Sequence, residues 1–249
     1  MSIHPHAQSF GAVAAEYEKG RPTYPPAAVS WLAESCGIGA GTPVLDLAAG
    51  TGKFTRALVE RGAEVVAVEP VEGMRARLQM DLPQVTALYG TAERIPLPDA
   101  AVHAVTVAQA FHWFDHARAL QEIHRVLVAQ GRLGVIFNVR QPVDHLEVAL
   151  EQIWDRYRRD VPTHSDGRWR EAMAASELFG PVVHQSFEME QVLRSAEEVV
   201  ARATSTSFIA SLPRQQLGSV VEEIHELCRR SPTPAVLHYR TDCYWSHRL

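Results

Sequence analysis

The stretch that decides the fold is "TPVLDLAAGTGKFTRALVERGAEVVAVEP", residues 42–70. It begins with a short apolar run that ends at a glycine, which is typical of a buried strand followed by a turn. Residues 52–62 then carry apolar side chains at helical spacing and end in Gly62. Residues 63–70 are rich in β-branched side chains and end in proline. We therefore expect a strand, a glycine loop, a helix and a second strand in direct succession.

The alternation of strand and helix continues to about residue 140. The elements that we expect there are helices at 72–80 and 116–131 and strands at 84–90, 100–110 and 131–139. These strands are apolar throughout, which is typical of a parallel sheet covered on both faces. We predict a doubly wound α/β domain, in which a ligand lies at the carboxyl ends of the strands.

The last hundred residues contain no recognisable motif. Their periodicity predicts helices at 143–160, 195–212 and 214–230 and strands at 181–193 and 235–249. Arginines gather in 156–170 and suggest a receptor for an anionic substrate, although such a charge run is more typical of a solvated helix face.

Composition narrows the function classes. The net charge of −5 argues against nucleic-acid binding. The three cysteines, Cys36, Cys228 and Cys243, lie far apart, so neither a metal site nor a disulfide scaffold is expected. There is no signal-peptide pattern and no apolar run of about 18 residues. We expect a cytoplasmic protein with no membrane partner.

The glycine loop does not match a nucleotide-hydrolysing phosphate loop. That motif needs a glycine five positions before Gly52 and a hydroxyl after Lys53. Leu47 and Phe54 stand at these positions.

The dinucleotide fingerprint is matched in part, because Thr55 stands where its third glycine belongs. Glu69 follows Gly50 by 19 residues, where an acid can accept hydrogen bonds from ribose hydroxyls. Asp46, at the opening of the loop, would repel a pyrophosphate but suits a cofactor with a cationic group.

Several segments together resemble the class I S-adenosylmethionine-dependent methyltransferases. "LDLAAGTG" resembles their first motif, acid-x-x-x-Gly-x-Gly, and "VVAVEP" resembles the second. "YGTAERIPLPDAAVHAVTVAQAFHWF" resembles the third and fourth. Two further stretches are similar to the small-molecule branch of this family, which includes methyltransferase type 11 and trans-aconitate methyltransferase-like proteins. "FGAVAAEYEKGRPTYP" is similar to the N-terminal segment of that branch, and "LHYRTDCYW" is similar to its final strand. The resemblance covers about residues 8–140.

The resemblance implies a Rossmann-like, mostly parallel, seven-stranded sheet with a helical lid. It also implies S-adenosylmethionine as cofactor and S-adenosylhomocysteine as product. The domains expected are a lid with the first helix, a cofactor-binding core, a helical insertion that caps the substrate, and a part that completes the sheet and pocket: residues 1–40, 41–140, 141–180 and 181–249.

The resemblance also assigns site residues. His112, Trp113 and Phe114 would face the substrate, with His112 as a candidate base. The chain departs from the family at Ala92, where an acid is usual, and at 102–103, where Phe-Asp is usual. The residues assigned to the cofactor are Tyr17, Arg21, Asp46, Ala48, Gly50, Thr51, Gly52, Glu69, Pro70, Met74, Thr91, Ala92, Glu93, Gln109, Ala110 and Phe111.

We therefore predict methyl transfer to a small-molecule carboxylate, hydroxyl or amine by a monomer or homodimer. Three alternatives stay open: methylation of RNA or protein, a non-catalytic cofactor-binding or regulatory protein, and an NAD(P)-dependent oxidoreductase.

Overall fold

The structure, a computed structural model, describes residues 20–158, 161–231 and 234–249. The chain divides into two compact units. The first, which we call the sheet unit, comprises Tyr24–Asn138, Pro162–Phe187 and Thr241–Leu249. The second, which we call the helical unit, comprises Met1–Thr23, Val139–Val161 and Glu188–Arg240.

One sheet holds seven strands in the order β3-β2-β1-β4-β5-β7-β6. The strands are β1 (Pro43–Leu47), β2 (Glu64–Val68), β3 (Thr86–Leu88), β4 (Val102–Ala108), β5 (Leu127–Arg140), β6 (Val183–Leu193) and β7 (Ala235–His247). Neighbours from β3 to β5 are parallel. The predicted doubly wound α/β fold is therefore confirmed.

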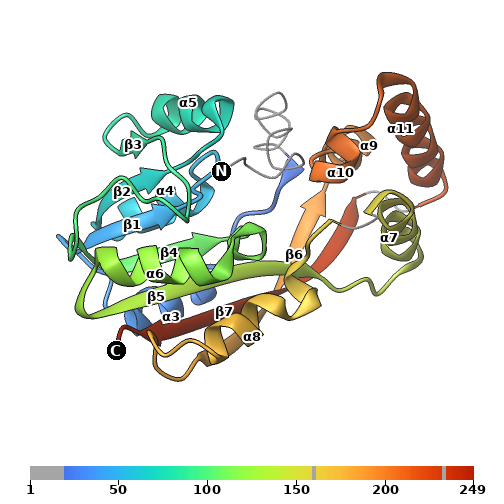
Figure 1. Ribbon diagram of the computed structural model, residues 1–249. Helices are drawn as coiled ribbons and strands as arrows, with labels where there is room; N and C mark the ends of the chain where they lie inside the picture. The colour runs from blue at the N-terminus through green and yellow to red at the C-terminus, as the bar shows by residue number, and fades with distance from the viewer. Residues whose placement is uncertain (1–19, 159–160, 232–233) are drawn as a thin grey trace. The chain divides into compact units, whose positions relative to one another are not determined.

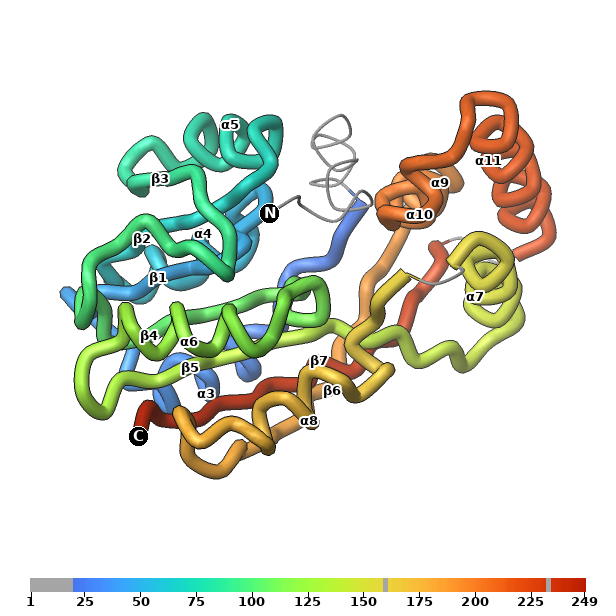
Figure 2. The backbone as a smooth tube through the Cα atoms, in the orientation of Figure 1, coloured from blue at the N-terminus to red at the C-terminus, as the bar shows by residue number. Residues whose placement is uncertain are grey.

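The strand order reverses at β1. From β1 the chain adds β2 and β3 on one side, and then returns to place β4 and β5 on the other side (Figures 1 and 2). A ligand crevice forms at such a reversal, beyond the carboxyl ends of the strands. The loops that follow β1, β2 and β4 are therefore the ones that the fold brings to the site.

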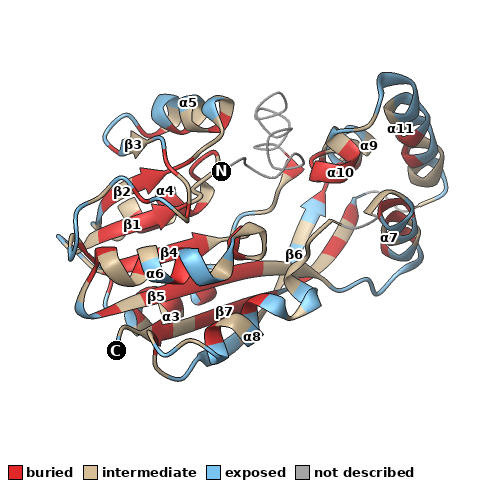
Figure 3. Ribbon diagram, in the orientation of Figure 1, coloured by how far each residue is buried: buried red, intermediate tan, exposed pale blue. Residues whose placement is uncertain are grey.

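Helices of the sheet unit cover both faces of its strands; α6 lies on one face and α3 on the other (Figure 1). The central strands between them are largely buried (Figure 3). Apolar side chains of α3 and α4 share one core with residues of β1, β2 and β4. The helices of this unit are α3 (Pro26–Ser35), α4 (Lys53–Val59), α5 (Glu72–Asp81), α6 (His116–Val126) and α8 (Arg168–Ala174), with 3-10 turns η2 (Phe111–Trp113) and η3 (His164–Asp166).

The helical unit has a core of its own. Trp154, Ile209, Ile224 and Leu237 belong to this buried cluster. Its helices are α7 (His145–Arg158), α9 (Ala196–Thr204), α10 (Ser207–Ala210) and α11 (Arg214–Arg229). Among the described residues, no helix is long and apolar enough to cross a membrane.

Two predicted helices have different limits in the structure. The helix expected over 116–131 ends at Val126, because Leu127 is fully buried and pairs with Val102 in the sheet. The stretch 195–212 forms two helices, α9 and α10. The hydroxyls of Ser205 and Thr206 donate to the carbonyls of residues 202 and 203, which terminates the first of these helices.

Candidate cofactor site

The loop between β1 and α4 is built on two glycines in the left-handed region. Gly50 has a φ of 59° and Gly52 a φ of 87°. A Cβ on Gly52 would also lie 3.0 Å from Cγ of Leu78 and 3.1 Å from Cδ1 of Leu82 in its neighbourhood. Glycine is therefore required at this position by both backbone conformation and space.

Glu69 lies directly after β2, and its carboxylate reaches the glycine loop. The backbone N–H of Gly50 donates to Oε2 at 2.8 Å, and that of Val71 donates to Oε1 at 2.8 Å. Arg75 donates to the backbone carbonyl of Glu69 at 2.8 Å. The structure thus brings together Gly50 and Glu69, which follow neighbouring parallel strands.

The Glu69 side chain is only 4 % exposed. Burial raises its pKa to about 7, although the two backbone N–H groups and Arg75 act in the opposite direction. A carboxylate held in this way keeps lone pairs that can accept further donors, such as the paired hydroxyls of a ribose.

Asp46 is fully buried beneath the loop. Its Oδ2 accepts the hydroxyl of Thr55 at 2.6 Å, and its Oδ1 accepts the hydroxyl of Thr106 at 3.1 Å. Burial raises its pKa to about 6 against these two hydrogen bonds. Thr55 occupies the position of the missing third glycine, and its side chain holds the acid at the start of the loop.

The segment that follows β3 forms a tight turn in which Thr91 pairs with Arg94. Ala92 is buried at 4 % exposure. The carboxylate of Glu93 accepts the backbone N–H of Asp115 at 3.0 Å, which ties this turn to the start of α6. The sulfur of Met74, from α5, lies 3.8 Å from the position that a Cβ on Gly50 would occupy.

The chain leaves β4 through Gln109, which has a φ of 59°. Its backbone N–H donates to Ile136 at 2.9 Å, and its side-chain amide donates to the carbonyl of Asn138 at 3.3 Å. The side chain of Asn138 in turn accepts the hydroxyl of Thr241 at 2.7 Å. Asn138 and Thr241 carry no sequence signal that would have assigned them to this network.

The 3-10 turn after β4 is aromatic. Phe111 is fully buried and packs edge-to-face against Phe114 and Trp169, with ring centroids 5.4 and 5.9 Å away. The His112 ring lies 5.0 Å from the Trp113 ring and 5.7 Å from the Phe137 ring. The histidine thus sits among apolar walls at the carboxyl end of β4, the edge where the fold positions ligands.

Two of the residues predicted to bind the cofactor, Tyr17 and Arg21, precede the sheet unit in the sequence. Tyr17 lies outside the described residues. Arg21 belongs to the helical unit, where its Nε and Nη2 donate to the backbone carbonyl of Ser205 at 3.3 and 3.1 Å. In the described part of the chain, no cluster of His, Cys, Asp or Glu suits a metal ion.

Comparisons with known proteins identify the family. A methyltransferase domain family matches residues 45–135. A protein of Mycobacterium tuberculosis named as an uncharacterized methyltransferase is 39 % identical, with 94 % of this chain and 93 % of that protein covered. This chain belongs to the class I S-adenosylmethionine-dependent methyltransferases. A methyltransferase-like protein of Schizosaccharomyces pombe is 34 % identical over 90 % of this chain and 88 % of its own length.

Solved structures share the fold of this methyltransferase. A putative type II methyltransferase from Anaeromyxobacter dehalogenans has a TM-score of 0.68 at 23 % identity, covering 92 % of this chain and 97 % of its own. A putative methyltransferase from an antibiotic biosynthesis pathway of Anabaena variabilis has a TM-score of 0.61 at 21 % identity, covering 90 % and 98 %. Family membership decides the donor class that the glycine loop left open in favour of S-adenosylmethionine.

The residues of the site fit this cofactor. A ligand can approach Gly50 closely, since among the described residues a Cβ at this position would meet only the Met74 sulfur, at 3.8 Å. The Glu69 carboxylate lies beside it, oriented by two backbone N–H groups. Two buried acids at one loop favour a ligand with cationic and hydroxyl groups over a pyrophosphate.

Proposed function

We propose that this methyltransferase acts on a small-molecule acceptor with an oxygen, nitrogen or carbon nucleophile. The observation that carries the donor half of the proposal is the hydrogen bond between the Gly50 N–H and Glu69. When bound, S-adenosylmethionine supplies an electrophilic methyl group on a sulfonium. The electron pair of the acceptor's nucleophile would form the new bond to the methyl carbon, and sulfur would keep the electron pair of the carbon–sulfur bond that breaks.

The donor-side residues have distinct proposed roles. Glu69 accepts the ribose hydroxyls, and Ala92 and Glu93 flank the adenine. Asp46 keeps negative charge beneath the loop for the cationic end of the cofactor. The rest of the proposed binding surface comes from the glycine loop, from α5 and from the segments that follow β2, β3 and β4: Ala48, Gly50, Thr51, Gly52, Pro70, Met74, Thr91, Gln109, Ala110 and Phe111.

The acceptor-side proposal rests on the aromatic turn after β4. His112, Trp113 and Phe114 would form a wall that excludes water and orients the nucleophile, which is the main task when the methyl donor is already activated. A carboxylate nucleophile would need no base, whereas a hydroxyl or ammonium must lose its proton, and we propose His112 as the group that would accept it.

Named relatives support a small-molecule acceptor. Demethylmenaquinone methyltransferase of a Mycobacterium species is 42 % identical over 110 residues, 42 % of this chain and 46 % of its own length. A putative sarcosine dimethylglycine methyltransferase from Galdieria sulphuraria shares the fold with a TM-score of 0.58. The net charge of −5 also argues against RNA as acceptor.

The first test compares ligands and then acceptors. We expect S-adenosylhomocysteine to raise the free energy of unfolding by about 2.7 kcal/mol at a hundredfold excess over Kd, and NAD⁺ to leave it unchanged. Transfer of labelled methyl from S-adenosylmethionine is then followed with panels of small acids, phenols and amines, and with RNA and protein. Binding without transfer to any panel would support a non-catalytic protein, and salt-sensitive transfer to RNA would overturn the small-molecule assignment.

The role of His112 is tested by His112→Ala. We expect turnover to fall about 100-fold for a hydroxyl or amine acceptor, because proton acceptance by a positioned base is lost. Affinity for S-adenosylhomocysteine should remain within about twofold, since no donor contact is removed. His103→Ala, an exposed histidine of β4, is the matched control. Loss of donor affinity with turnover preserved would instead assign His112 to the cofactor.

A further inference from the structure

Arg202 is a buried cation in the helical unit. It lies near the end of α9 and is only 1 % exposed. Its Nε donates to the hydroxyl of Tyr239 at 2.6 Å, and this hydroxyl donates to Oε1 of Gln191 at 3.1 Å. The guanidinium carbon lies 5.2 Å from the ring centroid of Trp154 and 5.6 Å from that of Tyr239. The groups that contact the guanidinium are therefore neutral: the Tyr239 hydroxyl accepts from Nε, and the rings of Trp154 and Tyr239 lie close to the guanidinium carbon.

The charge of Arg202 has no counter-charge among the residues that the structure describes. No aspartate or glutamate within this part of the chain forms an ion pair with it, and its Nη1 atom has no hydrogen-bond partner. A buried cation without a paired anion is strongly unfavourable, so such groups are rare unless a ligand neutralises them.

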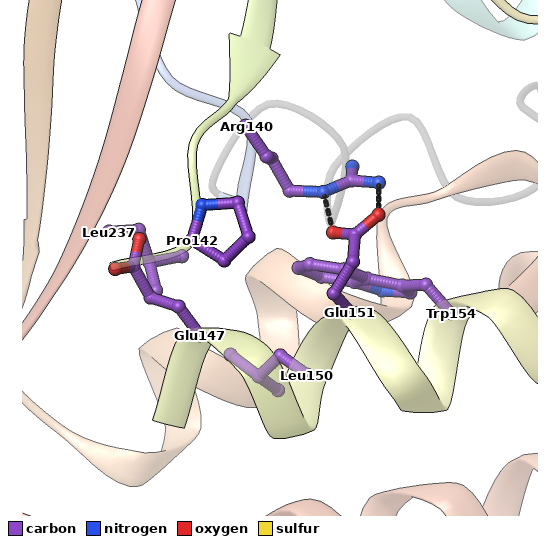
Figure 4. A pocket seen from close by; sticks show the side chains of 7 residues that line it. All are labelled: Arg140, Pro142, Glu147, Leu150, Glu151, Trp154 and Leu237. Atoms are coloured by element: carbon purple, nitrogen blue, oxygen red, sulfur yellow. Dashed lines mark hydrogen bonds and ion pairs between the residues drawn. The ribbon is translucent and has the colours of Figure 1, made fainter. Parts of the chain in front are cut away.

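A neighbouring arginine shows the contrast. Arg140 also lies over the Trp154 ring, with its guanidinium carbon 4.1 Å from the centroid. It is more exposed than Arg202, yet Glu151 binds it through both carboxylate oxygens at 2.6 and 3.0 Å (Figure 4). Arg158 donates to the same Glu151 at 2.6 Å. Within its described residues, the helical unit thus provides an acidic partner for Arg140 and Arg158, which are more accessible, and none for Arg202.

We propose that Arg202 is an anion-binding residue of the helical unit and that its ligand is the carboxylate of a small molecule. A single guanidinium carries one charge and a planar fork of donors, which matches a carboxylate. A phosphate dianion would need further cationic or N–H donors, whereas the indole N–H of Trp154 already donates to the carbonyl of Ala203 at 3.2 Å and the Tyr239 hydroxyl donates to Gln191. This site lies wholly within the helical unit, so the proposal stands independently of methyl transfer.

Access to Arg202 requires a movement, because its Nη1 atom is buried. The side chain of Trp154 is the group whose displacement would give this access. Its indole lines a small pocket together with Pro142, Leu150 and Leu237, with Arg140, and with two acids, Glu147 and Glu151, that are already bonded to His238 and to Arg140 and Arg158 (Figure 4). The same indole lies against Arg202. Displacement of this ring would open the guanidinium to the pocket, whose apolar wall suits the carbon skeleton of a carboxylic acid.

Thermal unfolding of the ligand-free protein is the first test. We expect Arg202→Met to raise Tm by about 2 °C or more, because an apolar side chain of similar length removes an uncompensated buried charge. Arg140→Met is the matched control and should lower Tm, since it leaves Glu151 without its bidentate partner. A lower Tm for Arg202→Met, or its failure to fold, would overturn the proposal and make Arg202 a structural residue.

The second test uses anions at constant ionic strength. Formate, acetate and succinate, with chloride as reference, should raise the Tm of the wild type by about 3 °C at saturation and leave that of Arg202→Met unmoved. Equal shifts in both proteins, including no shift in either, would overturn the proposal. A larger shift with inorganic phosphate than with any carboxylate would overturn the choice of ligand class. Binding of S-adenosylhomocysteine to the wild type is measured separately, and its failure would count against the proposed function alone.

Discussion

Replacing Glu69 by alanine should weaken the binding of S-adenosylhomocysteine by about 10- to 100-fold, or about 1.5–3 kcal/mol, because hydrogen bonds to a charged group are lost. The variant also leaves the N–H groups of Gly50 and Val71 without their acceptor. These donors set the path of the glycine loop, so the loss of affinity has a direct part and a positional part. Calorimetric titration measures the sum of both.

A control separates charge from position. Glu72→Ala removes the same charge three residues further on, at an exposed position in the first turn of α5, and should leave affinity within about twofold. The Tm of each variant establishes that the protein compared is folded. Unchanged affinity of a folded Glu69→Ala would remove this residue from the cofactor site.

The ligand-free protein should lose stability as the pH rises from about 5 to about 7.5. Burial raises the pKa of Asp46 to about 6 and that of Glu69 to about 7, above the ordinary values of 3.8 and 4.5. In this window the folded chain holds protons that the unfolded chain has released, so stability falls with rising pH. At about 1.4 kcal/mol per pH unit between pH 5 and the raised pKa, Asp46 contributes about 1.4 kcal/mol of this loss and Glu69 about 2.8 kcal/mol.

Other groups act differently within the same range. Burial lowers the pKa of His116, and its contribution to stability is lost as the pH falls below about 6.5. Arginine contacts hold the pKa of Glu122 and Glu151 low, so their contributions are lost only at more acid pH. The share of Asp46 is therefore isolated by comparing the wild type with Asp46→Asn.

Urea unfolding at a series of pH values provides this comparison. The wild type should lose more stability than Asp46→Asn between pH 5 and 7.5, while Glu72→Gln should follow the wild type. Parallel curves for the wild type and Asp46→Asn would show that Asp46 is ionised at no cost in the fold.

Periodicity was a sufficient guide to the strands and to most helices. The helix expected over 72–80 is α5, Glu72–Asp81, and the one expected over 143–160 includes α7, His145–Arg158. Each of these helices carries its buried apolar residues on one side, and this spacing can be recognised within a short segment of the sequence. The helix expected over 116–131 was too long because Leu127 exchanges helical bonds for pairing with Val102, a partner that is distant in sequence.

The same distinction applies to the polar residues. Gly50 and Glu69 were each predicted to contact the cofactor, because they follow neighbouring strands, and the hydrogen bond between them was not predicted. Thr106 carries no such signal, since it is 60 residues from Asp46, and threonine is an ordinary strand residue. Among arginines the pattern pointed to 156–170, where Arg156, Arg158 and Arg168 turn out to be paired with acids.

The fold, the glycine loop and the acid that reaches it follow from residue order, because backbone conformation and strand periodicity are properties of short segments. The hydroxyl partners of Asp46 do not follow from residue order, and neither does the lack of an acidic partner for Arg202 within the described part of the chain. They depend on which side chains from remote segments fill the space around a buried charge, and this is settled when helices and strands pack. A charged residue looks the same in sequence whether folding gives it a counter-charge or leaves it for a ligand to supply.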